Sequence, residues 1–182
     1  MSKKIENLKK SIESIENKEQ TIVFSVPDTQ GAPKGDVVQV YLLAELLNGL
    51  GYKVTMLYEK KDYTRVGSWL GEKYDNLPHT TMEENELKVS PADILIIPEA
   101  YSHLVEQTVK LPINRVVLVQ DHENMLNGYL PGKTWADYGI TETLTISHTL
   151  AGLIQPLVRL NSVQKITPIV DDEVFHKTTE LK

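Results

Sequence analysis

The stretch TIVFSVPDTQGAPKGDVVQVYLLAELLNGLGYKVTMLY, residues 21–58, decides the fold class of this protein. Its first six residues are β-rich, residues 27–36 form a turn-rich loop, and residues 37–50 follow the pattern of an amphipathic helix. The apolar face of that helix is predicted at Val40, Leu43, Leu47 and Leu50. Residues 53–58 have the pattern of the next strand. The stretch therefore predicts a β–loop–α–β unit, which opens a doubly wound parallel sheet.

The predicted helix over residues 37–50 is bordered by two residues that suit helix ends. Asp36 has a side chain that can accept a hydrogen bond from a free backbone N–H group, so it is predicted as the N-cap. Gly51 follows the last apolar residue and is predicted as the C-cap, where the chain leaves the helix.

Strands and helices continue to alternate along the rest of the chain. Residues 93–97 (DILII) are apolar on both faces, as expected of a central parallel strand. Further strands are predicted at residues 115–120, 144–147 and 163–170, and helices at residues 102–111, 123–129 and 149–160. Pro156 predicts a kink or an early end in the last helix. Residues 59–91 are less regular, with a short helix over 63–74, a short strand or extended segment over 77–82 and a helical turn over 83–89. We predict an α/β fold with a Rossmann-like doubly wound parallel sheet.

The N-terminal residues add an amphipathic helix to this domain. Residues 3–17 carry a stripe of apolar side chains at Ile5, Leu8, Ile12 and Ile15. A helix of this length is marginal in water on its own, so the stripe must pack on the domain or on a second copy of the chain. We expect an N-terminal helix over residues 1–19, a Rossmann-like domain over 20–176, a tail or start of a linker over 177–182, and homo-oligomers through residues 3–17.

Composition excludes several classes of protein. The formal net charge of −6 argues against a nucleic-acid partner, because phosphate binding needs clustered lysine and arginine. The chain has no cysteine, which excludes disulfides and thiolate metal sites. No apolar run approaches the ~18 residues that a membrane span requires, and the N-terminus lacks a secretory leader pattern. We expect a cytoplasmic protein without a membrane span.

The first candidate for a ligand site is the loop over residues 27–36, because open parallel sheets bind ligands at the carboxyl ends of their strands. Gly31 and Gly35 allow close approach to the backbone, and the N-terminus of the following helix can hold a phosphate. The same residues also suit an ordinary turn. Their spacing matches neither the G-x-G-x-x-G pattern nor a Walker A loop, so no nicotinamide or nucleoside triphosphate cofactor is expected.

Two further loops carry polar residues directly after buried strands. Glu99 and Tyr101 can hydrogen-bond sugar hydroxyls, although Ser102 beside them can simply cap a helix. Asp121, His122 and Glu123 can bind a polar ligand or move a proton. One histidine beside two adjacent acids has poor metal-ligand spacing, so no metal is expected. In a fourth segment, Ser147 can cap the helix that follows or contact a ligand.

Four segments together resemble the N-terminal half of retaining glycosyltransferases with the GT-B fold, family 4-like. They are the first β–loop–α unit through LLNGLGYKVTML, then VVLVQDHENMLNGYLPG, TLTISHTLAGLI and KITPIVDDEVFH. The resemblance covers roughly residues 21–176 in the same order. It departs from the family pattern in two places. The usual glycine pair of the first loop is Gly31-Ala32 here, and Ile169 replaces the usual glycine before Val-Asp.

The resemblance implies a fold and a role. In such enzymes the N-terminal domain binds the acceptor, and a C-terminal domain binds the nucleotide sugar that serves as donor. Carried over, Gly31, Ala32 and Gly35 would face the donor phosphates, and Asp121, His122 and Glu123 would line the acceptor side with Glu99 and Tyr101. The donor domain should follow residue 176, and the chain ends at residue 182.

From this resemblance we expect an acceptor-binding half that is inactive alone, with a glycan or another hydroxyl compound as acceptor and no cofactor bound by the protein. A separate donor-binding domain, from the same gene or another chain, would be its partner. A non-catalytic binding or oligomerisation module is the alternative. An independent small-molecule enzyme is a third hypothesis, against which the missing dinucleotide pattern counts.

Overall fold

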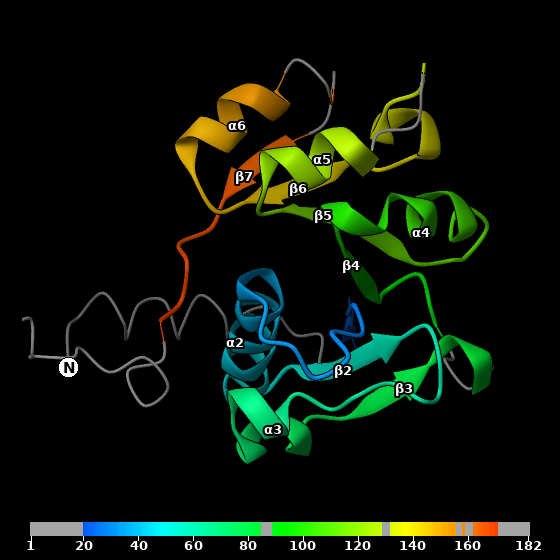
Figure 1. Ribbon diagram of the computed structural model, residues 1–182. Coiled ribbons are helices and arrows are strands. Elements are labelled where there is room, and N and C mark those ends of the chain that lie inside the picture. Colours follow the sequence, from blue (N-terminus) through cyan, green and yellow to red (C-terminus); the bar gives the residue numbers. More distant parts are fainter. Residues whose placement is uncertain (1–19, 85–88, 129–131, 156–157, 159–161, 171–182) are drawn as a thin grey trace, which may run out of the picture.

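The computed structural model describes residues 20–84, 89–128, 132–155, 158 and 162–170 (Figure 1). Within them, seven parallel strands form one sheet in the order β3-β2-β1-β4-β5-β6-β7. The strands are β1 (Thr21–Ser25), β2 (Lys53–Tyr58), β3 (His79–Thr81), β4 (Ile94–Pro98), β5 (Asn114–Val119), β6 (Glu142–Thr145) and β7 (Ser162–Lys165). The predicted α/β fold with a doubly wound parallel sheet is confirmed. The helix predicted over residues 3–17 and the tail over 177–182 lie outside the described residues.

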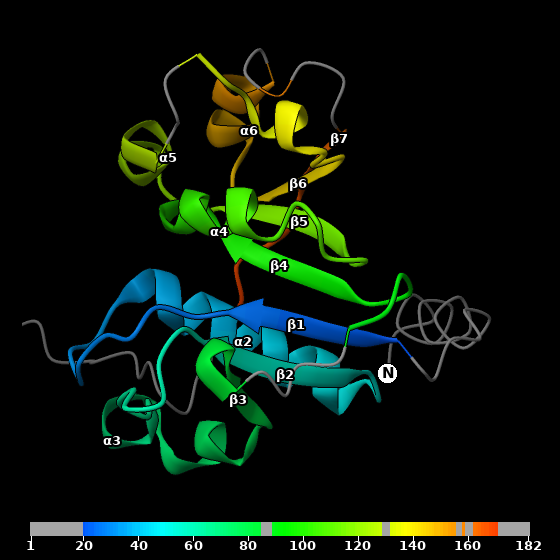
Figure 2. The ribbon, with the colours of Figure 1, turned by 90° about the vertical axis from the view of Figure 1, so that its right-hand side faces the viewer.

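Helices cover both faces of the sheet. The helices are α2 (Gly35–Gly49), α3 (Gly67–Leu70), α4 (Ser102–Gln107), α5 (His122–Gly128) and α6 (His148–Ile154), with short 3₁₀ turns at Glu72–Asn76, Met82–Glu84, Glu99–Tyr101 and Trp135–Tyr138. Successive strand residues point to opposite faces, so Phe24 packs in the core under α2 while Val23 packs in the core under α4, α5 and α6. Figures 1 and 2 show α2 on one side of the sheet and α4 on the other.

Helix α2 differs from its prediction at both ends and in its buried face. It begins at Gly35, with Lys34 at the N-cap and no side-chain cap, so the prediction of Asp36 as N-cap was wrong. Asp36 lies inside the first turn, where its Oδ1 accepts the Val37 N–H at 2.9 Å. The prediction that Leu50 belongs to the buried face was also wrong, because Leu50 is the C-cap residue and is 42% exposed. Gly51 comes directly after this cap with a φ of +92°, a conformation that glycine adopts without strain.

The buried face of α2 is wider than the predicted stripe. Its fully buried side chains are Val37, Val38, Val40, Tyr41, Leu42 and Ala44, while Leu43 and Leu47 are partly buried. The helix lies flat on a sheet and contacts it over a broad surface, whereas a narrow stripe is typical of a helix that meets one other helix.

Other boundaries moved for identifiable reasons. The helix predicted over residues 63–74 is divided into α3 and a 3₁₀ turn because Gly71, with a φ of +126°, interrupts it. Helix α6 ends at Ile154, ahead of Pro156, which confirms the predicted early end. Strands β6 and β7 lie one to two residues earlier than predicted and β7 is shorter, since residues 166–170 leave the sheet. Among the described helices, none has the length and apolar character needed to cross a lipid bilayer.

Candidate functional site

The strand order places a switch point between β1 and β4. From β1 the chain proceeds outward to β2 and β3, and from β4 it proceeds in the opposite direction to β5, β6 and β7. The loops that leave β1 and β4 therefore diverge to opposite faces at the carboxyl edge of the sheet (Figure 2). Ligands of open α/β sheets bind at this kind of position.

A cleft of about 490 Å³ opens beside the switch point. Its walls come from the start of helix α2, from the turn between β5 and α5, and from the end of β6. The lining residues are Lys34, Gly35, Asp36, Gln39, Gln120, Asp121, Asn124 and Ile146. We call this space the main cleft. Its volume lies in the range typical of small-molecule sites.

Gln120 connects the two sides of the main cleft. Its amide Nε2 donates a hydrogen bond to the main-chain oxygen of Asp36 at 3.1 Å, which ties strand β5 to the first turn of α2. Its Oε1 is buried and has no hydrogen-bond partner in the structure. A buried amide oxygen without a partner is costly unless a donor reaches it, so Gln120 carries an unused hydrogen-bond acceptor in the wall of the main cleft.

Glu99 supports the turn that carries Asp121. The residue is only 2% exposed, and its Oε1 accepts the Asp121 N–H at 2.9 Å. Its Oε2 is buried without a partner. Burial raises the pKa of Glu99 to about 7, against backbone hydrogen bonds that act in the opposite direction, and the nearby charge of Asp36 raises it further. Glu99 therefore retains a proton at neutral pH in a large share of molecules.

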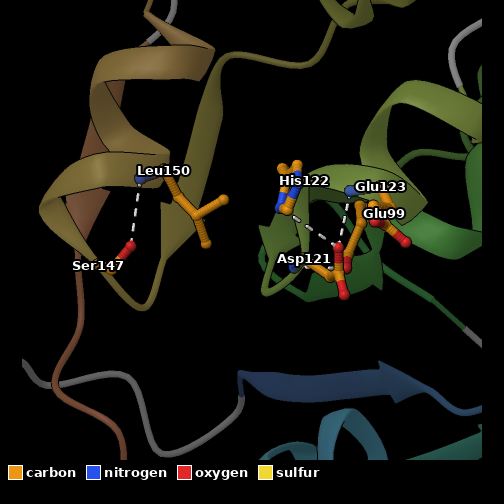
Figure 3. A network of polar contacts seen from close by, with 6 residues as sticks. All are labelled: Glu99, Asp121, His122, Glu123, Ser147 and Leu150. Carbon is orange, nitrogen blue, oxygen red and sulfur yellow. Dashed lines mark hydrogen bonds and ion pairs between the residues drawn. The ribbon is translucent and has the colours of Figure 1, made fainter.

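Asp121 and His122 lie at the centre of the predicted polar cluster, and Figure 3 shows them together with Glu99 and Glu123. Asp121 Oδ1 accepts the Glu123 N–H at 2.7 Å, and this hydrogen bond caps helix α5. The same oxygen lies 3.7 Å from His122 Nδ1. Asp121 lines the main cleft, whereas Glu123 is exposed and does not line it. In the described part of the chain, no three His, Asp or Glu side chains gather closely enough to hold a metal ion.

Tyr101 lies apart from the main cleft, on the side of the switch point that faces β2. Burial raises the pKa of its hydroxyl, and the nearby carboxylate of Glu59 adds to the effect. Its ring packs 5.2 Å from that of His103, whose Nε2 contacts Glu59 Oε1. The alternative that Ser102 caps the next helix was wrong, because Tyr101 occupies the N-cap of α4 and no side chain caps this helix.

The predicted phosphate loop divides into two parts. Gly31 and Ala32 form a tight turn, in which the Ala32 N–H donates to the Thr29 oxygen at 3.0 Å and Gly31 has a φ of +80°. Neither residue lines the main cleft, but Gly35 does. Asp28 holds this turn, since its Oδ1 accepts the Gln30 N–H at 2.9 Å. The structure therefore brings together Gly35 and Asp121 and leaves Gly31 and Ala32 outside.

A second cleft of about 410 Å³ lies between helices α5 and α6. It is lined by Gln120, Asp121, His122, Ser147, Thr149, Leu150 and Leu153. Ser147 caps α6, as one of the two interpretations of this segment predicted, because its Oγ accepts the Leu150 N–H at 3.1 Å.

Six lining residues of the main cleft were not among the predicted site residues: Lys34, Asp36, Gln39, Gln120, Asn124 and Ile146. Lys34 and Asp36 lie in the predicted phosphate loop over residues 27–36, and Gln120 and Asn124 flank the predicted polar run, but none of them was singled out as a site residue. Comparisons of the chain with family models, with curated proteins and with solved structures found no match.

Proposed function

We propose that this chain is the acceptor-binding half of a glycosyltransferase, and that its main cleft holds the hydroxyl groups of a sugar acceptor. The observation that carries the proposal is the unpartnered, buried Oε1 of Gln120, a residue that lines the main cleft beside the switch point. A sugar hydroxyl group can donate the hydrogen bond that this oxygen lacks. Asn124 and Asp121 line the same cleft and offer further hydrogen bonds to a polyol.

The charges along the main cleft support a neutral acceptor over an anionic ligand. Among the described lining residues, Lys34 is the one cation, and Asp36 and Asp121 are carboxylates. Asp36 also occupies the first turn of α2, where a phosphate would otherwise meet free N–H groups. These carboxylates disfavour a diphosphate here, so we assign the nucleotide sugar to a separate donor-binding domain, as the resemblance implies, but not to a position against Gly35.

Binding without turnover is the expected behaviour of this chain alone. In the resembled enzymes the contacts that stabilise the transition state at the donor come from the second domain, and catalysis requires those contacts. Purified chain should therefore bind acceptor sugars and should not release nucleotide from a nucleotide sugar.

The test is an NMR titration of the ¹⁵N-labelled full chain with a panel of methyl hexosides and with a nucleotide sugar. We expect at least one hexoside to shift amide signals around Gln120 and Asn124 with saturable dependence, and Gln120→Leu to weaken this binding at least about tenfold. Gln107→Leu, at an exposed position of α4, is the matched control and should bind as the wild type does.

Two results would contradict the proposal. One is the absence of saturable shifts with every hexoside, which would favour the non-catalytic module without a sugar ligand. The other is stronger binding of the nucleotide sugar than of any hexoside in the main cleft, which would place the donor rather than the acceptor there.

A further inference from the structure

The second cleft differs from the main cleft in having leucine side chains of α6 in its wall. Ser147 Oγ already accepts the Leu150 N–H, and Asp121 Oδ1 already accepts the Glu123 N–H. These two polar atoms of the cleft are thus engaged in capping α5 and α6. The cleft also has an apolar wall on α6.

That apolar wall consists of Leu150 and Leu153, which are three residues apart and therefore share a face of the helix. Leu150 is nearly buried, whereas Leu153 is 49% exposed. In Figure 3 the side chain of Leu150 points from α6 toward His122 on α5. An exposed leucine on the wall of a cleft gains free energy when an apolar group covers it.

The two clefts adjoin each other at Gln120 and Asp121, which line both. A ligand that contacts Gln120 in the main cleft can therefore extend past Asp121 into the second cleft. The main cleft, on one side of the turn at Gln120 and Asp121, has polar groups for a sugar. The second cleft, on the other side, has the apolar side chains of Leu150 and Leu153.

We propose that the two clefts form one bipartite site for an amphiphilic acceptor, a glycoside whose sugar lies in the main cleft and whose apolar aglycone lies against Leu150 and Leu153. This inference rests on the proposed function, because it assumes a sugar in the main cleft. It adds the substrate class: the acceptor carries an aryl or alkyl group next to its sugar, rather than being a sugar alone.

The test compares matched pairs of ligands on the full chain. Dissociation constants are measured by NMR titration for each methyl hexoside and for the phenyl hexoside of the same sugar and anomeric configuration. We expect the phenyl member of the bound pair to bind at least about tenfold more tightly, because its ring covers apolar surface. Leu153→Asp should reduce this ratio to about one. Leu46→Asp is the control, since Leu46 is 47% exposed on helix α2, lines neither cleft, and should leave the ratio as in the wild type.

The outcomes separate the two proposals. Equal affinity of methyl and phenyl members, or a ratio that Leu153→Asp does not change, overturns the bipartite site and leaves the sugar site standing. Failure of all hexosides to bind overturns both. A change of sedimentation coefficient on Leu153→Asp would assign the apolar wall to contact with a second copy of the chain, and would also overturn the bipartite site.

Discussion

Substituting Glu99 by glutamine should change how the stability of the fold depends on pH. The wild-type carboxyl has a pKa near 7 in the folded chain and an ordinary value of 4.5 when unfolded. Below about pH 4.5 both states hold the proton, so the group contributes no difference. Between pH 4.5 and about 7 the unfolded chain loses the proton while the folded chain keeps it, so the free energy of unfolding falls as pH rises. At 1.36 kcal/mol per pKa unit, the loss reaches about 3 kcal/mol above pH 7.

Glu99→Gln removes this ionisation and keeps a carbonyl oxygen that can accept the Asp121 N–H. The difference in free energy of unfolding, variant minus wild type, should therefore rise by about 3 kcal/mol from about pH 4 to about pH 8. Urea titrations followed by far-UV circular dichroism at several pH values measure it. Taking the difference removes the contributions of all other groups, provided that they are the same in both proteins.

Glu106→Gln, which changes an exposed carboxyl of α4, is the control and should follow the wild type at every pH. A Glu99→Gln difference that stays constant over this range would refute the reasoning, because it would mean that burial does not hold the carboxyl neutral. A difference that falls with increasing pH would show that the folded state favours the ionised form of Glu99.

Three smaller predictions concern single contacts. Ser147→Ala should lower the free energy of unfolding by about 1 kcal/mol in urea titrations, because it removes the cap of α6, and Ser102→Ala should change it less, since no side chain caps α4. Gly31→Ala should lower the melting temperature, because Gly31 has a φ of +80°, whereas Gly49→Ala within α2 should raise it. Tyr41→Phe should destabilise the fold by about 1–2 kcal/mol in urea titrations, because it leaves the hydroxyl of the neighbouring buried tyrosine without its 2.6 Å partner.

The fold could be predicted because its main signals are local. Apolar runs such as residues 94–97 pack into the cores on both faces of the sheet, and a chain that alternates them with helices has few ways to cover them. The errors also have local causes. The early end of α3 depends on the φ of Gly71, and the cap of α2 depends on whether the chain enters the helix at Gly35 or one residue later. Neither choice is visible in the apolar pattern.

The candidate site was predicted less completely, because a cleft is made by residues far apart in the sequence. The polar run that includes Asp121 was recognisable, since a structural loop does not need so many hydrogen-bonding groups directly after a buried strand. Its partners across the cleft were recognised only in part. Lys34 lies in the loop predicted as a phosphate site, whereas Gln39 belongs to a helix that the sequence relates to Gln120 only through the strand order.

Gln39 connects segments of the chain that are far apart in the sequence. Its side-chain amide makes two hydrogen bonds to the main chain of Ile169: Nε2 donates to the Ile169 oxygen at 2.8 Å, and Oε1 accepts the Ile169 N–H at 3.0 Å. Residues 166–170 thereby return from β7 to the side of α2, as the trace in Figure 1 shows. Because Gln39 also lines the main cleft, the position of that wall depends on a segment 130 residues away. The turn at Gln120 and the segment at Ile169 are therefore parts of one structural unit around α2, although each has a separate local sequence pattern.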